Sequence, residues 1–423
     1  MKKTYNVVDM FCGAGGESAG IMQAAQEQGV KVNLFAINHW ECAIQTHSAN
    51  YPMAEHLCQS VEHIDPVKVI PGQKLDLLWA SPECTHHSLA RGGRPRSEQG
   101  RASAWLILKW LSELYVERVI IENVSEFLSW GPLDKNGKPI KSQKGKTFRA
   151  FISSIQSLGY TADWRILCAA DYGDPTTRKR LFIQAVKGRK LIAWPEITHI
   201  DGGASLMGYQ GWRPAQDIID WSIPGASIFG RKKPLADNTL KRIASGIEKY
   251  WKDCAEPFLA VLYGTGKTRS LDMPLPTITS KAHHALIEPF ITRYQGSHNG
   301  RQDGESRNHA IERPLPCVDT SNRYALVNPF VFSIGHCSSG SSYRTRSIDK
   351  PLSTIVTKAE HCLVEPGMRF DISLRMLKPR ELKRAHSFPD DYILKGNAAE
   401  QTKQIGNSVP VNLAKALAKT AMS

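Results

Sequence analysis

The first 190 residues alternate short apolar runs with amphipathic stretches, and this alternation limits the possible folds more than any other feature. It is typical of a doubly wound α/β sheet, here expected to be mixed, with helices on both faces. Ligands in such folds bind at the carboxyl ends of the strands. The clearest helix is predicted over 102–115, where apolar residues recur at spacings of three and four. Strands are predicted over residues 5–10, 32–37, 75–80, 118–122 and 181–185.

The composition changes after residue 190. Residues 191–370 are rich in Gly, Pro, Ser, Thr, Arg and His with short β-like runs, and they predict a second, β-rich domain. Helical periodicity returns over 379–386 and 411–421, so we expect residues 371–423 to pack onto the domain formed by residues 1–190.

The β-rich region contains three internal repeats, over about 256–287, 288–327 and 328–364. Each opens with Pro-Phe, at Pro257, Pro289 and Pro329, and contains two β-like runs around a polar, basic tip. One interpretation is a stack of hairpins that serves as scaffold. The other is a recognition surface whose tips, over 264–269, 294–307 and 338–346, contact phosphates and base edges of DNA.

The charge of the chain favours a polyanionic partner. It has 54 Lys and Arg against 40 Asp and Glu, for a net charge of +14. Neutralising phosphates supplies much of the affinity of proteins for nucleic acids, although many basic proteins bind none.

Cysteine usage and hydropathy exclude several classes of protein. The nine cysteines include no Cys-x-x-Cys pair, so neither a zinc site nor thioredoxin-type chemistry is expected, and no metal is predicted. No signal peptide and no apolar run long enough to cross a membrane are found. We therefore expect a cytoplasmic protein, and we expect it to act as a monomer.

Polar loops follow the predicted strands, and three of them contain candidate functional residues. Residues 9–18 (DMFCGAGGES) place glycines directly before a helix, where backbone amides approach a ligand. Ser18 replaces the third glycine of a dinucleotide-binding loop, so the loop alone indicates only a nucleoside-type cofactor or a tight turn. Cys84 lies in the loop after the third strand, a setting that can produce a thiolate nucleophile.

The fourth strand ends in Glu122, whose carboxyl group is expected over the same crevice as Cys84. Arg178 and Arg180 enter the next strand on one face, and such a pair suits phosphate or carboxylate or forms a solvated edge.

Together these motifs resemble the DNA cytosine-5 methyltransferase family. In chain order they are Asp-x-Phe-x-Gly-x-Gly-Gly from Asp9, Pro-x-Cys from Pro82, Glu-Asn-Val from Glu122, Arg-x-Arg from Arg178 and Gly-Asn-Ser-Val-Pro from Gly406. The segment 380–389 is similar to the family's penultimate block. The resemblance covers about 5–190 and 372–423, and the stretch between is where this family has its target-recognition domain.

The resemblance implies that Cys84 attacks C6 of an extruded cytosine. Glu122, protonated or sharing a proton, then supports the charge at N3, and Arg180 with Arg178 holds the base and orders Glu122. Methyl transfer from S-adenosylmethionine to C5 follows, with double-stranded DNA as the substrate.

For the cofactor, the resemblance places Phe11, Gly13 and Gly15 around the methionine part of S-adenosylmethionine, with Asn407 and Ser408 nearby. Trp40 corresponds to an aromatic residue that faces the adenine. Three positions depart from the family pattern and bear on cofactor affinity and pH dependence. Glu83 replaces a proline, Thr176 replaces a glutamine, and His39 replaces the acid that binds the ribose, leaving Glu41 as a substitute.

Other functions stay open at this point. An RNA cytosine-5 methyltransferase of the same fold is disfavoured by the long repeat region. A non-catalytic DNA-binding paralogue is disfavoured by the intact Cys84 and Glu122, and a nicotinamide-dependent dehydrogenase by Ser18. The target sequence cannot be deduced, and a cognate restriction endonuclease, phage self-protection or an orphan role are all compatible with these residues.

Overall fold

The computed structural model describes residues 3–82, 103–134, 139–202, 208–229, 231–250, 257–262, 266–281, 283–292, 308–310, 330–333, 345–347, 361–364 and 370–423. By its internal contacts the chain divides into two units. The first comprises residues 1–221, 261–284 and 376–423, and the second comprises 222–260 and 285–375. Residues 191–221 and 261–284, assigned to the second domain from composition, thus have their contacts in the first unit.

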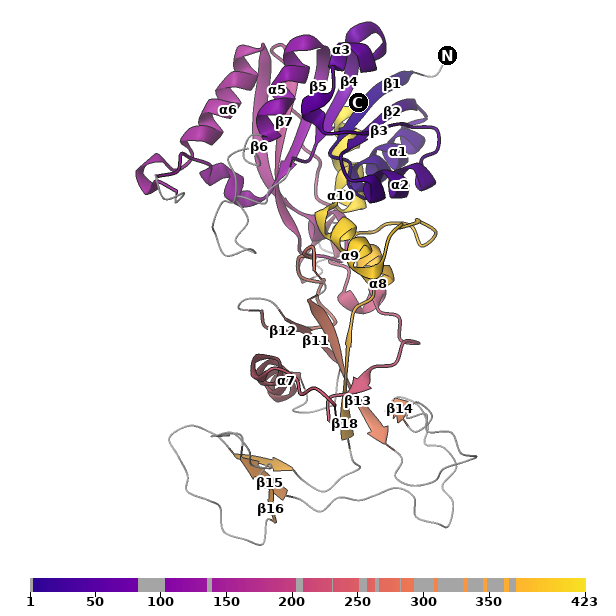
Figure 1. The fold of residues 1–423 in the computed structure, drawn as a ribbon, viewed down its shortest axis with the longest axis vertical. Helices are drawn as coiled ribbons and strands as arrows, with labels where there is room; N and C mark the ends of the chain where they lie inside the picture. The colour runs from indigo at the N-terminus through magenta and orange to yellow at the C-terminus, as the bar shows by residue number, and fades with distance from the viewer. Residues whose placement is uncertain are drawn as a thin grey trace. The chain divides into compact units, whose positions relative to one another are not determined.

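The first unit is built on a seven-stranded mixed sheet with helices on both faces (Figure 1). The strand order is β3-β2-β1-β4-β5-β7-β6, in which the first five strands are parallel while β7 is antiparallel to β5 and to β6. This confirms the predicted doubly wound mixed sheet. The strands are β1 (Thr4–Met10), β2 (Lys31–Asn38), β3 (Glu55–Cys58), β4 (Lys74–Ala80), β5 (Tyr115–Asn123), β6 (Tyr160–Cys168) and β7 (Lys179–Lys187).

Two apolar cores lie on the two faces of this sheet. One packs residues of α5 and α6, including Trp110 and Phe151, against strand residues such as Val8. The other packs α1 and α10 against the opposite face, where Trp79 and Leu417 are fully buried. Both cores are needed because alternate residues of each strand face opposite sides. The helices are α1 (Gly16–Gln28), α2 (Glu41–Asn50), α3 (Pro66–Val69), α5 (Leu106–Glu113), α6 (Lys146–Ser157) and α10 (Val411–Ala421).

The predicted helix over 102–115 is too long at its carboxyl end. Helix α5 ends at Glu113, and Tyr115 is the first residue of β5. The apolar residues Leu114 and Val116 continue the pattern across this junction, which is why periodicity alone missed the end of the helix.

The C-terminal segment closes the first unit. Helices α8 (Pro379–Ala385) and α9 (Ala398–Asn407) precede α10, which packs along α1. A side chain at Gly20 of α1 would meet Ala414 and the backbone of Lys415, so glycine is required for this close approach. The predicted packing of the C-terminal residues onto the first domain is therefore present.

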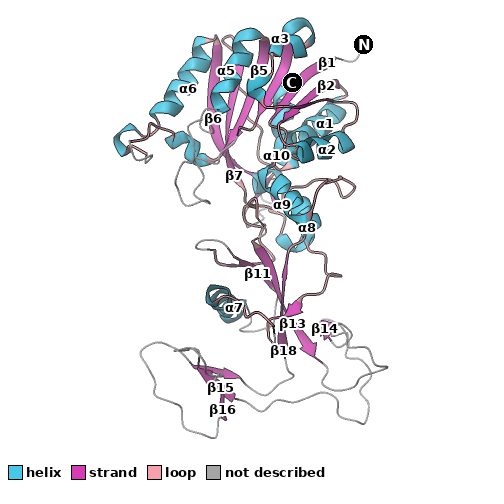
Figure 2. Cartoon of the chain, in the orientation of Figure 1, coloured by secondary structure: helices cyan, strands magenta, loops and turns pink. Residues whose placement is uncertain are grey.

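The second unit is rich in strands (Figure 2). One sheet has the order β10-β18-β13-β11-β12 with β14 paired to β13, and a separate three-stranded sheet has the order β16-β15-β17. The Pro-Phe repeats coincide with strands, since β11 begins at Phe258 and β15 at Phe330. The elements are α7 (Asp237–Tyr250), β10 (Ala226–Ser227), β11 (Phe258–Val261), β13 (His284–Thr292), β14 (Asn308–Ala310), β15 (Phe330–Ser333), β16 (Thr345–Ser347), β17 (His361–Val364) and β18 (Phe370–Met376). The edge strand β12 (Thr268–Ser270) falls within residues 261–284, which belong to the first unit.

No helix within the described ranges is both long and apolar enough to cross a membrane.

A buried carboxylate holds the start of α10. Asp174 is fully buried, and its two oxygens accept hydrogen bonds from the backbone amides of Asn412 (3.2 Å) and Leu413 (3.0 Å). Amides in the first turn of a helix have no partner within the helix, so the carboxylate of a distant loop replaces the missing acceptors. Burial is the main cause that raises the pKa of Asp174 to about 7.

We predict that the free energy of unfolding of Asp174→Asn, relative to the wild type, rises as the pH increases from 4 to 7 and is constant above. Between pH 3.8 and about 7, Asp174 holds a proton in the folded protein but not in the unfolded chain. The free energy of unfolding of the wild type therefore falls as the pH rises through this range, whereas an asparagine at this position does not titrate. Urea unfolding at pH 5 and pH 8 measures the difference. Asp201→Asn, at an exposed position, is the matched control, and equal pH dependence of both variants would contradict the prediction.

Candidate active site

The loop after β1 turns sharply through three residues with positive φ. These are Phe11 (68°), Gly13 (51°) and Gly15 (79°), and Gly15 is the residue that precedes α1. A side chain at Gly15 would lie 2.7 Å from the hydroxyl of Tyr392 and 2.9 Å from the ring of His47. The glycine is thus required both by its backbone conformation and by its neighbours.

A chain of hydrogen bonds runs from Asp9, inside the fold, through Ser18 and His47 to His56. Ser18 Oγ donates to Asp9 Oδ2 (2.6 Å), and His47 Nε2 lies 2.9 Å from Ser18 Oγ. Because the hydroxyl proton of Ser18 is committed to Asp9, His47 Nε2 is the donor to Ser18, and its Nδ1 accepts from His56 Nε2 (2.8 Å). Burial lowers the pKa of His47 to about 3 and raises that of Asp9 to about 7. Ser18, the departure from a dinucleotide loop, is therefore a structural member of this network.

The C-terminal motif lies against the same loop. A side chain at Gly16 would meet the carbonyl of Val409 and the Cβ of Ser408, so the two segments are in contact. Ser408 is buried and donates to the carbonyl of Ile405 (2.8 Å), while Asn407 is exposed at the end of α9. The structure thus brings Ser408 to Gly16, which directly follows the loop of Phe11, Gly13 and Gly15.

Trp40, expected to face an adenine, precedes α2 and is half-buried. Lys403 of α9 places its ammonium group 4.2 Å from the centre of the indole ring, a contact that no sequence signal indicated. His39 and Glu41 are both exposed, and Glu41 accepts a hydrogen bond from Gln45 (3.2 Å).

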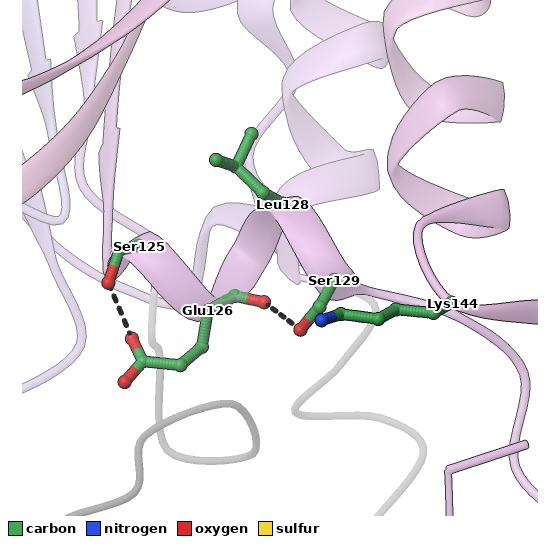
Figure 3. Close-up of a pocket in the computed structure, with 5 residues that line it drawn as sticks. All are labelled: Ser125, Glu126, Leu128, Ser129 and Lys144. Atoms are coloured by element: carbon green, nitrogen blue, oxygen red, sulfur yellow. Dashed lines mark hydrogen bonds between the residues drawn. The ribbon is translucent and has the colours of Figure 1, made fainter. Parts of the chain in front are cut away.

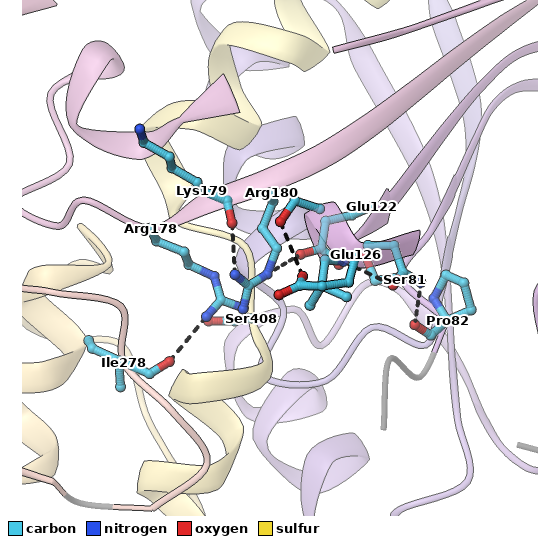
Figure 4. Close-up of polar contacts among 12 residues, drawn as sticks. Ser81, Pro82, Glu122, Glu126, Arg178, Lys179, Arg180, Ile278 and Ser408 are labelled. Carbon is cyan, nitrogen blue, oxygen red and sulfur yellow. Dashed lines mark hydrogen bonds and ion pairs between the residues drawn. The ribbon is translucent and has the colours of Figure 1, made fainter. Parts of the chain in front are cut away.

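Glu122 and Arg180 form an ion pair where β5 and β7 meet (Figure 4). The Nε of Arg180 lies 3.1 Å from Glu122 Oε1, and the side chains are 14% and 9% exposed, so the pair is largely shielded from water. Arg180 also donates to the carbonyl of Lys179 (2.8 Å), which fixes its guanidinium. Arg178, in contrast, is buried and donates to the carbonyl of Ile278 (3.1 Å). The two arginines therefore have different partners.

His386, which sequence reasoning did not single out, is fully buried beside this cluster. Its Nδ1 lies 3.1 Å from Ser408 Oγ, which connects the arginines to the C-terminal motif. Burial, followed by the charges of Arg178 and Arg180, lowers the pKa of His386 well below its usual value. The ring is therefore neutral.

The predicted nucleophile, Cys84, and the neighbouring Glu83 lie outside the described residues. The chain is described up to Pro82, whose carbonyl accepts a hydrogen bond from Asn123 Nδ2 (3.3 Å). Ser81 donates from its backbone amide to the carbonyl of Met10 (3.1 Å). The segment leading to Cys84 thus starts between the glycine loop and the strand end that carries Glu122.

A pocket of about 290 Å³ lies on the turn that follows β5 (Figure 3). Glu126 Oε2 accepts from Ser125 (3.1 Å), and the carbonyl of Glu126 accepts from Ser129 (2.7 Å). None of the residues predicted for the active site lines it, so we assign it no role. Its lining residues are Ser125, Glu126, Leu128, Ser129 and Lys144.

The residues around the glycine loop suit a nucleoside cofactor with a positive charge. Asp9 Oδ1 is buried without a hydrogen-bond partner among the described residues, and an acidic group beside the loop suits a cationic ligand. Among all the residues that the structure describes, no group of three or more His, Cys, Asp or Glu is arranged to hold a metal ion.

Comparison with known sequences gives a single family. The family model described as C-5 cytosine-specific DNA methylase matches residues 5–201 and 282–423. The chain is 26% identical to the type II methyltransferase M.AgeI of Thalassovita gelatinovora over 459 residues, covering 98% of each protein. It is 30% identical to the type II methyltransferase M.XorII of Xanthomonas oryzae pv. oryzae over 200 residues, covering 45% of this chain and 43% of that protein.

Solved structures give the same fold. A crystal structure of a Spodoptera frugiperda DNMT2 mutant matches with a TM-score of 0.54 at 14% identity, covering all of both chains. The crystal structure of the S. pombe Dnmt2 methyltransferase matches with a TM-score of 0.52 at 14% identity, covering 98% of this chain and 96% of that one. At these identities the likeness concerns the fold alone.

We predict that Ser18→Ala lowers the free energy of unfolding by about 1–3 kcal/mol, because it leaves buried polar atoms of Asp9 and His47 without partners. Chemical denaturation at constant pH measures the change. Ser112→Ala removes a serine hydroxyl on the exposed side of α5 and is expected to change stability by less than about 0.5 kcal/mol. A Ser18→Ala variant as stable as the Ser112→Ala control would show that the chain of hydrogen bonds does not stabilise the fold.

Proposed function

Because the chain belongs to the C-5 cytosine-specific DNA methylase family and is a DNA (cytosine-5)-methyltransferase, we propose that Cys84 is its nucleophile and that Glu122 and Arg180 hold the target cytosine. The single observation that carries this assignment is the shielded ion pair of Glu122 and Arg180 at the end of β5. Pro82, two residues before Cys84, accepts a hydrogen bond from Asn123, which directly follows Glu122. The chain therefore leaves the described region beside Glu122.

The proposed chemistry begins with Cys84. C5 of cytosine is a poor nucleophile, and addition of a thiolate to C6 gives C5 enamine character. After C5 has accepted a methyl group, loss of its proton restores the double bond and expels the thiolate. Since C6 is inaccessible within a stacked duplex, the cytosine is extruded from the helix.

Glu122 and Arg180 act on the ring during the addition. Negative charge develops at N3 as sulfur bonds to C6, and a carboxyl group that gives or shares a proton there lowers the barrier. Arg180, held by the carbonyl of Lys179, orients Glu122 and can donate to the O2 of the base. Arg178 instead donates to the carbonyl of Ile278, and its charge acts on the neighbouring ring of His386.

We assign S-adenosylmethionine to the crevice formed by the glycine loop and the C-terminal motif. When bound, this cofactor supplies a methyl group activated by a sulfonium. The residues that would hold it are Phe11, Gly13, Gly15, Trp40 and Ser408, together with Asn407. Glu41 is retained as the proposed ribose ligand, since its bond from Gln45 occupies only Oε1 and leaves Oε2 to accept from a ligand.

The β-rich unit is the proposed target-recognition domain, with double-stranded DNA as its ligand. The positively charged composition of the chain and the resemblance to the family support this assignment. M.AgeI and M.XorII are named type II methyltransferases, which supports a cognate restriction endonuclease as a functional partner in a bacterial cytoplasm. Bisulfite sequencing of DNA from cells that express the chain would identify the target.

We predict that the protein forms a covalent complex with duplex DNA that contains 5-fluorocytosine at its target, in the presence of S-adenosylmethionine. Fluorine cannot leave C5 as a cation, so the enzyme stays bonded to C6. Denaturing electrophoresis detects the complex. Cys84→Ser is expected to abolish it, whereas Cys58→Ser, at an exposed cysteine, retains it. A complex that persists in Cys84→Ser would exclude Cys84 as the nucleophile.

Glu122→Gln is predicted to lower the rate of methyl transfer by about 100-fold or more, because the amide cannot give a proton to N3. The Kd for DNA should change by less than about threefold, since the amide keeps its size and an acceptor. Single-turnover kinetics and a gel-shift titration separate the two quantities. Equal losses in rate and affinity would remove Glu122 from the chemistry.

A further inference from the structure

Glu17 is a buried acid that the proposed chemistry does not use. It is the second residue of α1, directly after the glycine loop, and it is 1% exposed. Among the described residues it makes no ion pair, and its ionisable neighbours include the carboxyl groups of Asp9 and Glu122. Burial is the main cause that raises the pKa of Glu17 well above its usual value, and Asp9 adds to it. The charged form of this carboxyl group is therefore disfavoured.

The side chain of Glu17 is bonded to the segment that leads to Cys84. Ser81 Oγ donates to Glu17 Oε1 (2.8 Å), and the backbone amide of Ser81 donates to the carbonyl of Met10 (3.1 Å). On the opposite side, Asn123 holds the carbonyl of Pro82 (3.3 Å). Ser81 and Pro82 are thus bonded both to the residues that bracket the glycine loop and to the neighbour of Glu122.

Stability does not account for an acid at this position. The second oxygen, Oε2, is buried without a partner in the described part of the chain, and an unsatisfied buried polar atom costs about 1–3 kcal/mol. An apolar side chain of similar volume avoids that penalty. The acid instead provides one specific bond, to the hydroxyl of Ser81. The backbone bond to Met10 holds the main chain of Ser81 but does not by itself fix the orientation of its side chain.

We propose that Glu17 is a positioning residue that fixes the Ser81–Pro82 strand end against the glycine loop and so sets the place from which Cys84 reaches the cytosine. The inference rests on the proposed role of Cys84. It assigns Glu17 to thiol addition and not to cofactor binding. A displacement of a reacting group by about 1 Å slows a reaction by up to about 100-fold, so one lost bond at this strand end has a measurable effect.

Tritium release from duplex DNA labelled at cytosine C5, without cofactor, tests this inference. Addition of the thiol to C6 followed by protonation at C5 and reversal exchanges the label, so release reports thiol addition alone. We expect Glu17→Leu and Ser81→Ala each to slow release by about tenfold, and the double variant to be no slower than either single one, because both remove the same bond. Glu17→Gln keeps an acceptor for Ser81 and should release label within about threefold of the wild-type rate.

Three controls make the outcome unambiguous. Equilibrium dialysis should give a Kd for S-adenosylmethionine within about threefold of the wild type in all variants, and Ser112→Ala should match the wild type throughout. Normal release with a weakened Kd would overturn the inference in favour of cofactor binding. Loss in Glu17→Gln equal to that in Glu17→Leu, or additive loss in the double variant, would also overturn it. Release that persists in Cys84→Ser would instead refute the proposed nucleophile.

Discussion

The contact between the two ends of the chain is the constraint on which the catalytic unit depends. Helix α1 follows the glycine loop, helix α10 ends the chain, and they pack closely because Gly20 presents no side chain to Ala414. Met422 accepts a hydrogen bond from the hydroxyl of Tyr5 (2.5 Å), which binds the last turn to β1. This packing holds the C-terminal motif against the glycine loop, and the motif forms one side of the proposed cofactor site.

Buried carboxyl groups dominate the electrostatics of the crevice. Asp9, Glu17 and Glu122 approach one another at the carboxyl ends of β1 and β5, while the positive charge of Arg180 is paired with Glu122. Burial raises the pKa of Asp9 and of Glu17, and the charge of Asp9 adds to the shift of Glu17. Such a crevice tolerates a cationic ligand better than an anionic one, which fits a sulfonium cofactor. The network through Ser18 and His47 then fixes the orientation of Asp9.

The sequence predicted the central strands but not the edges of the sheet. Strands β1, β4 and β5 are apolar because both of their faces are covered, and runs of that kind are visible in a sequence. Strands β3 and β6 lie at the two edges of the sheet, where exposed and polar residues such as Glu55 and Arg165 interrupt the pattern. Helix α9 was missed for a similar reason, since its sequence AAEQTKQIGN has few apolar residues.

Site residues that belong to short sequence motifs could be proposed from the sequence, whereas contacts between residues far apart in the chain could not. Glu122, Arg178, Arg180 and Ser408 were proposed as site residues from strand ends and family motifs. The bond between Glu17 and Ser81 joins residues 64 positions apart, and that between Ser18 and His47 joins residues 29 apart. No local pattern marks such pairs. The side chains of Arg178 and Arg180 were expected to act together, and only the fold assigns them different partners.

Part of the first repeat packs within the first unit, beside the residues that precede β7. Its segment Pro-Leu-Pro-Thr-Ile-Thr over 274–279 lies against the loop before β7, where Leu275 and Thr177 are joined by a backbone hydrogen bond (2.8 Å). Ile278 accepts from Arg178, and Thr279 lies where a side chain at Gly406 would otherwise stand. The related segments after Arg313 and Lys350 belong to the second and third repeats. The first copy is therefore held in place by its contact with Arg178, whereas the corresponding segments of the other two repeats lie outside the described residues.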